Sequence, residues 1–110
     1  MRRRDFAGVV DVWPMRGEAM NNRKADELAD LLDVEVLAAD GLDDALIGFV
    51  ERCGEPIRLV YDRERCIEIL ESEIGDYGSA VEWFEFNTAG ADVGELTPFW
   101  FTSLETAGVE

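Results

Sequence analysis

The stretch from Tyr77 to Thr102 constrains the fold most, because it holds seven of the eleven aromatic residues of the chain. An aromatic helix, a glycine-bearing turn and an apolar strand follow one another along it. Aromatic rings bury large apolar areas, so we expect the core to form around this segment. The seven residues are Tyr77, Trp83, Phe84, Phe86, Phe99, Trp100 and Phe101.

The charge of the chain is strongly and unevenly acidic. The 110 residues, close to the commonest size of one domain, include 25 acidic and 10 basic residues, a net charge of −15. Residues 1–24 hold six basic and three acidic residues, and no basic residue follows Arg65. This charge disfavours DNA, RNA or an anionic membrane surface as a direct partner. It also exceeds the net charge of about 2–8 that keeps a small domain soluble, so we expect it to serve another purpose.

Cysteine usage and the N-terminus predict a cytoplasmic protein. Cys53 and Cys66 are the only cysteines, and histidine is absent. Two cysteines in a chain without a secretory signal are more often reduced thiols than a disulfide. Residues 2–4 are arginines, but residues 5–13 are too short and too polar for a signal-peptide core. No apolar run has the length of a membrane span.

The N-terminal part consists of a segment with two interpretations, followed by a predicted helix. Residues 1–20 are expected to be an arm or a short strand, since Gly8–Trp13 is mostly apolar and Pro14 would end a strand. Apolar residues at helical spacing then predict a helix from Arg23 to Asp33. Asn21 or Asn22 is expected to cap it.

A short apolar run, residues 34–38, leads into a turn that contains three aspartates. Asp40, Asp43 and Asp44 raise the possibility of a calcium loop, but the ligand spacing and the closing glutamate of an EF-hand are missing. A turn with helix capping is therefore the favoured interpretation.

Two apolar segments, residues 45–51 and 56–61, predict a β-hairpin around a turn at residues 52–55. Both faces of these strands are partly apolar, so we expect the sheet to be covered, at least in part, on both sides. Strict alternation divides the first strand into one face with Ile47 and Phe49 and another with Leu46, Gly48 and Val50.

Two helices are predicted after the hairpin. The first runs from Arg63 to about Ile74, with Asp62 as its cap. Gly75 breaks it, and Asp76 caps a second helix that Gly90 ends. The predicted buried stripes are Cys66, Ile67, Leu70 and Ile74 on the first helix, and Ala80, Val81, Phe84 and Thr88 on the second.

The predicted fold is α+β. It consists of an N-terminal helix, a β-hairpin, two helices and a returning C-terminal strand, Phe99–Thr102, in a small, mainly antiparallel sheet. Phe99 and Phe101 are expected to point away from Trp100. We divide the chain into an N-terminal arm or short strand (1–20), a single compact domain (21–103) and a frayed tail (104–110).

Five motifs follow one another in the second half of the chain: Val60–Leu70, Ala80–Asn87, Gly90–Ala91, Gly94–Glu95 and Thr97–Pro98. Together they resemble motifs of small, acidic, uncharacterised proteins encoded by phages and prophages. The resemblance covers about residues 42–101 and leaves residues 1–20 outside it. It implies a mobile-element origin and a bacterial host cytoplasm, and it implies no particular activity.

The sequence offers no catalytic motif. Without histidine, a thiol such as that of Cys53 has no evident base partner. The pairs Glu68 and Glu71, and Glu82 and Glu85, have the spacing of acid–base or metal carboxylates, but solvated helix faces commonly show the same spacing. We therefore predict no catalytic residue, no metal and no cofactor, and a protein that is not an enzyme.

The first predicted function is that of an anti-defence inhibitor, of the anti-CRISPR or anti-restriction type. It would bind a basic, nucleic-acid-binding groove of a host protein. Regularly placed carboxylates imitate DNA phosphates and release counterions as DNA does. The predicted partner-binding residues are Glu64, Glu68, Glu71, Glu73, Asp76, Glu82 and Glu85.

The alternative is a phage accessory module that binds another protein, or a second copy of itself, through exposed aromatic side chains. Its charge would then serve only solubility. Trp83, Phe86 and Trp100 are the candidate anchors, with packing in the core as the competing interpretation. The salt dependence of partner binding distinguishes the two functions, because screening weakens carboxylate contacts more than apolar ones.

Overall fold

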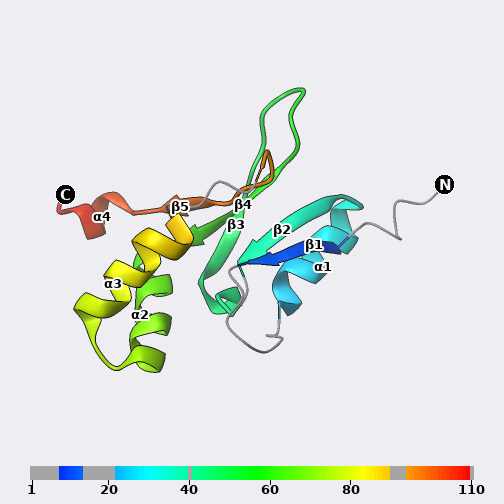
Figure 1. Cartoon of the computed structure of the whole chain (residues 1–110). Helices are drawn as coiled ribbons and strands as arrows, with labels where there is room; N and C mark the ends of the chain where they lie inside the picture. Colours follow the sequence, from blue (N-terminus) through cyan, green and yellow to red (C-terminus); the bar gives the residue numbers. More distant parts are fainter. Residues whose placement is uncertain (1–7, 14–21, 40, 90–93, 110) are drawn as a thin grey trace.

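The computed structural model describes residues 8–13, 22–39, 41–89 and 94–109. Within these ranges the chain alternates helices and strands (Figure 1). The elements are β1 (Gly8–Trp13), α1 (Arg23–Leu32), β2 (Glu35–Ala39), the 3₁₀ turn η2 (Asp43–Ala45), β3 (Leu46–Val50), β4 (Arg58–Asp62), α2 (Arg63–Ile74), α3 (Tyr77–Phe84), the π-helical turn η3 (Glu85–Ala89), β5 (Phe99–Phe101) and α4 (Leu104–Ala107). None of the described helices has the length and apolar character that a membrane span needs.

The described strands form two sheets. β1 and β2 pair in parallel, and β3, β4 and β5 form a three-stranded sheet with β4 at its centre. β3 and β4 make the predicted antiparallel hairpin, but β5 runs parallel to β4. The sheet is therefore mixed, and the prediction of a mainly antiparallel sheet is corrected. The chain leaves β4, passes through α2 and α3 and returns in the same direction, and parallel pairing requires such a crossover.

The parallel pair of β1 and β2 falls in two regions of the sequence. One is the predicted N-terminal arm or short strand, and the other is the apolar run of residues 34–38, which was assigned to no element. β1 falls inside residues 1–20, so the strand alternative holds for Gly8–Trp13. β2 covers most of the apolar run, and its residues Val36–Ala39 are all buried. A continuous buried run is typical of a strand covered on both faces. Residues 1–7 and 14–21, the rest of the predicted arm, lie outside the described residues.

β3 departs from strict alternation. Its register with β4 shifts between Leu46 and Gly48, which makes Ile47 an extra residue. Such a bulge reverses the alternation, so Leu46 faces the same side as Phe49. Leu46 is buried and Ile47 is exposed. The prediction that Ile47 shares a face with Phe49 is therefore wrong.

The predicted first helix is present, but its cap comes from elsewhere. Asn22 occupies the N-cap position without a capping side-chain hydrogen bond. Instead, the Asp43 carboxylate accepts hydrogen bonds from the backbone N–H groups of Lys24 (2.9 Å) and Ala25 (3.2 Å). The turn of aspartates thus caps α1 across the fold. The other residues considered for this cap and turn, Asn21 and Asp40, lie outside the described residues.

The two central helices match their predicted positions with local differences. Cys66, Ile67 and Leu70 are buried, but Ile74 is 42% exposed in the last turn before the chain reverses. Asp62 stands at the N-cap of α2 without a side-chain capping bond. The expected pattern on the second helix is confirmed for Ala80, Phe84 and Thr88, which are buried.

The C-terminal segment is more regular than the expected frayed tail. Residues 104–107 form the short helix α4. The Ser103 hydroxyl caps it by accepting a hydrogen bond from the backbone N–H of Thr106 at 3.0 Å. Local capping thus gives these residues helical structure that apolar spacing did not predict.

The core is centred on β4 and the crossover helices rather than on residues 77–102. Of the seven aromatic residues in that stretch, only Phe84 is fully buried. Trp100 packs on it, with ring centroids 5.2 Å apart, and lies 5.7 Å from Tyr61. Three consecutive residues of β4, Leu59, Val60 and Tyr61, are buried, so both faces of this middle strand are covered there. The largest fully buried side chains include Tyr61, Phe84, Leu42, Leu59, Ile67 and Leu70.

Candidate functional site

The seven predicted partner-binding acids all lie on the crossover between β4 and β5. α2 and α3 pack side by side at one end of the three-stranded sheet, away from α1 (Figure 1). We refer to the solvent-facing side of residues 63–89 as the α2–α3 surface. α2 carries four of the acids, Asp76 lies between the helices, and Glu82 and Glu85 follow on α3 and η3.

The turn between the helices is built by two local residues. Gly75 ends α2 with a φ of 96°, a conformation that glycine adopts without a steric penalty. Asp76 then accepts a hydrogen bond of 2.7 Å from the backbone N–H of Ser79, as the sequence predicted. The hydrogen bonds from Ser79 hold the pKa of the Asp76 carboxyl below its usual value. This carboxylate is therefore fully ionised at neutral pH and in contact with water.

On α2 the acids form a group of three and one outlier. At about 100° per residue, Glu64, Glu68 and Glu71 fall within about 60° of one another on the helix. Glu68 is exposed and the other two are half-buried. Glu73 lies about 180° from Glu64 by the same geometry, beyond the buried stripe. The four carboxylates of α2 therefore do not share one face.

Two arginines neutralise part of the surface. Arg63 forms an ion pair with Glu85 at 2.7 Å, and Arg65 forms one with Glu68 at 3.1 Å. The Arg63 guanidinium also lies over the Phe84 ring, 5.4 Å from its centroid. These arginines were not predicted as part of the site. The three-residue spacing of Arg65 and Glu68 would have indicated their pair, but no local signal connects Arg63 with Glu85.

A tyrosine engages a third carboxylate. The Tyr77 hydroxyl donates a hydrogen bond of 3.1 Å to Glu64, which links the start of α3 to the first turn of α2. This hydrogen bond raises the pKa of the Tyr77 phenol above its usual value. Of the seven side-chain carboxylates, only those of Glu71 and Glu82 have no hydrogen bond or ion pair to the described part of the chain. They are the carboxylates most available to a partner.

The three candidate aromatic anchors have different environments. Trp100 is half-buried between Tyr61 and Phe84, and half-buried Trp83 packs against the core. Phe86 is 79% exposed. A shallow hollow of about 510 Å³ connects this ring with Glu82 and is lined by Ile74, Ser79, Glu82, Trp83, Phe86 and Asn87. Phe86 is therefore the anchor that a partner can reach most easily.

Negative charge is not confined to the α2–α3 surface. Exposed carboxylates also occur on α1, in the loop between β3 and β4 and on α4, for example at Asp26, Glu51 and Glu105. The α2–α3 surface differs because its only bases are Arg63 and Arg65, both already in ion pairs. Its remaining carboxylates have no basic neighbour further along the chain.

The cysteines are separate and differ in access. Both are free thiols, with Cys53 exposed and Cys66 fully buried. Burial raises the pKa of the Cys66 thiol to about 12, so it is protonated at neutral pH. Within the described ranges, no group of three or more cysteine, aspartate or glutamate side chains is arranged to hold a metal ion.

Comparison with known proteins gave no match: no family model, no curated protein and no solved structure is similar to this chain.

Proposed function

We propose that this chain is an anti-defence protein of the phage type, an inhibitor of a CRISPR or restriction enzyme. In this proposal its α2–α3 surface occupies a basic, nucleic-acid-binding groove of the host protein. The observation that carries it is the placement of seven acids along α2, α3 and the turns that adjoin α3, where the only bases are Arg63 and Arg65. A phage or prophage origin is part of this proposal, as the motif resemblance over about residues 42–101 implies.

The physical basis is the replacement of phosphates by carboxylates. A nucleic-acid-binding groove gains free energy from the release of counterions, and an acidic protein surface produces the same release. The carboxylates of Glu71 and Glu82 have no hydrogen bond or ion pair within the described chain, so they have no internal polar contact to break on binding. The ion-paired Glu68 and Glu85 would exchange an exposed internal contact, which is worth little, for one in a groove with less water.

A charge-reversal triple variant tests this proposal. In the test variant, Glu68, Glu71 and Glu82 are replaced by Lys. In the control variant, Lys replaces three acids that lie outside the α2–α3 surface, namely Asp26, Asp44 and Glu105. Both variants change the net charge equally, and circular dichroism checks that each remains folded. We expect only the first variant to lose capture of its partner from a host bacterial lysate and to lose inhibition of nucleic-acid cleavage. Equal losses in both variants would refute a specific surface, and no loss in the first would refute the proposal.

A second candidate function rests on the exposure of Phe86. This ring, 79% exposed beside the shallow hollow, would anchor a protein partner or a second copy of the chain through apolar contact. Here Phe86→Ala should abolish a complex that survives about 1 M NaCl, whereas the glutamate reversals should leave it intact. Sedimentation of the purified chain identifies a homodimer. A complex that dissociates steadily as salt rises would favour the acidic surface instead.

A further inference from the structure

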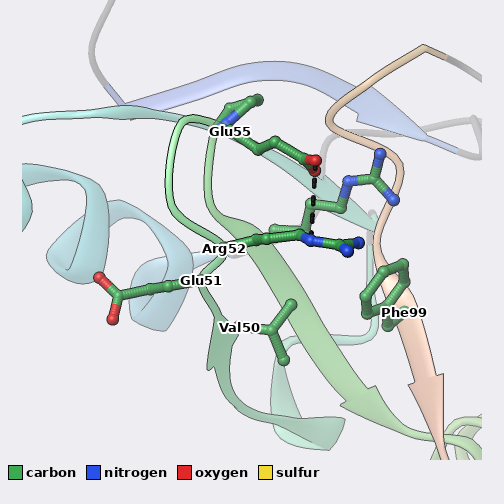
Figure 2. Close-up of a pocket in the computed structure, with 7 residues that line it drawn as sticks. Val50, Glu51, Arg52, Glu55 and Phe99 are labelled. Atoms are coloured by element: carbon green, nitrogen blue, oxygen red, sulfur yellow. Dashed lines mark ion pairs between the residues drawn. The ribbon is translucent and has the colours of Figure 1, made fainter.

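A second hollow lies on the opposite face of the three-stranded sheet. Trp100 packs against Phe84 of α3, and side chains alternate along a strand, so Phe99 points to the other face of the sheet. A hollow of about 520 Å³ opens there between the loop at residues 51–57 and β5 (Figure 2). Its lining includes Val50, Arg52, Glu55, Pro56, Arg58 and Phe99.

Arg58 is held in this hollow by two contacts that leave the end of its side chain available. Its Nε donates a hydrogen bond of 2.7 Å to the backbone carbonyl of Glu95. Its guanidinium carbon lies 5.1 Å from the centroid of the Phe99 ring, in a cation–π contact. No carboxylate of the described residues forms an ion pair with it. The terminal nitrogens therefore have N–H groups for a ligand while the side chain is already positioned.

The two carboxylates that line the hollow, Glu51 and Glu55, form no ion pair with Arg58. Arg52 lies between Glu55 and Phe99, and Glu51 is directed away from the ring (Figure 2). The Arg52 Nε is 4.0 Å from the Glu55 carboxylate, and the Arg52 side chain is 82% exposed. An exposed pair of this kind is weak. The hollow thus combines a positioned guanidinium, a loosely held second one and the apolar surfaces of Val50, Pro56 and Phe99.

We propose that this hollow binds a monocarboxylate that carries an apolar group, with Arg58 as the carboxylate-binding residue and Phe99 as the apolar wall. A planar guanidinium forms two parallel hydrogen bonds with a carboxylate. A single negative charge suits this chain better than a phosphate dianion, because its net charge of −15 repels a ligand in proportion to the ligand's charge. The ligand is either a free small carboxylate or the C-terminal carboxylate of a peptide that ends in an apolar residue.

The direct test is titration of the full chain with 3-phenylpropanoate, followed by NMR of the backbone amides and of the Arg58 Nε–H. We expect saturable shifts at residues 50–58 and 95–99 and none on the α2–α3 surface. The neutral amide of the same compound should bind at least about tenfold more weakly, because it lacks a charge-assisted contact. Equal binding of the amide, or shifts located elsewhere, would overturn the proposal.

Variants assign the roles of the two side chains. Arg58→Lys keeps the charge but loses the planar fork, and we expect affinity to fall by about tenfold or more. Phe99→Leu keeps an apolar wall without the ring, and it should weaken the binding of phenylpropanoate more than the binding of acetate. Unchanged affinity in folded Arg58→Lys would contradict the assignment. The glutamate reversals on the α2–α3 surface should leave this binding in place, so the two proposals fail independently.

A comparison with peptide ligands distinguishes the two sources of carboxylate. An N-acetylated tripeptide that ends in phenylalanine is compared with its C-terminal amide. Tighter binding of the free acid than of phenylpropanoate identifies a protein C-terminus as the ligand, and equal or weaker binding identifies a small carboxylate. Failure of both acids to bind would overturn the site.

Discussion

Replacing Tyr61 by Phe tests whether a buried hydrogen bond ties β2 to the three-stranded sheet. The backbone N–H of Ala39, in β2, donates to the Tyr61 hydroxyl, in β4, at 3.0 Å. Both residues are completely buried. Burial raises the pKa of Tyr61 well above its usual value, so the hydroxyl is neutral at neutral pH. The substitution removes one oxygen and keeps the ring in the core.

The expected cost follows from the group that is left behind. Without the hydroxyl, the Ala39 N–H is buried with no acceptor, which costs about 1–3 kcal/mol. This is a large share of the roughly 5–15 kcal/mol by which a domain is stable. With a urea m-value of about 2 kcal/mol per M, the unfolding midpoint should fall by about 0.5–1.5 M. The Ala39 amide should also exchange faster with solvent than in the wild type.

Tyr77→Phe is the matched control, because it removes the same atom from an exposed ring. Tyr77 is 46% exposed and donates to Glu64 at 3.1 Å. Water can replace this contact, so the stability should change by less than about 0.5 kcal/mol. If Tyr61→Phe costs no more than Tyr77→Phe, the hydrogen bond from β2 does not hold the two parts together and the reasoning fails.

Three further predictions concern capping, thiol access and pH. Asp43→Ala should lower the free energy of unfolding by about 1–2 kcal/mol in urea titrations, because α1 loses its cap. The control, Asp44→Ala, should lower it by less than about 0.5 kcal/mol. Similar values for the two variants would contradict the capping role of Asp43. Under native conditions an aromatic disulfide reagent should modify only Cys53, and Cys66 only after unfolding; two rapid modifications would contradict the burial of Cys66. Because the pKa of Asp76 is lowered in the folded state, its ionised carboxylate adds stability at pH values above its usual pKa, and this stability is lost as the pH falls through the folded-state pKa. The thermal midpoints of wild type and Asp76→Asn should therefore converge on acidification.

The elements that were predicted correctly depend on neighbours in the sequence. The positions of α1, the hairpin, α2, α3 and β5 followed from apolar periodicity and from breakers such as Gly75. The cap by Asp76 was also correct, because its acceptor and donor lie three residues apart. The acids of the α2–α3 surface were placed on the right helices for the same reason.

The features that were missed depend on residues far apart in the chain. The Asp43 cap joins residues 18 and 19 positions apart, and the ion pair of Arg63 with Glu85 spans 22. The parallel direction of β5 depends on how the crossover returns to the sheet. The bulge at Ile47 reversed the pattern of one strand although every residue identity was known.

Exposure of the aromatic residues shows the same division. Their clustering in residues 77–102 suggested a core, but a ring is buried only where another element covers it, as Trp100 covers Phe84. Phe86 and Phe99 remain exposed, and they line the two hollows on which the proposals rest. Residue order alone was sufficient for the helices, their breaks and the overall charge, because these depend on local propensity and composition. Strand direction, distant caps and the accessible side chains depended on packing, because they arise from contacts between residues that are remote in the sequence.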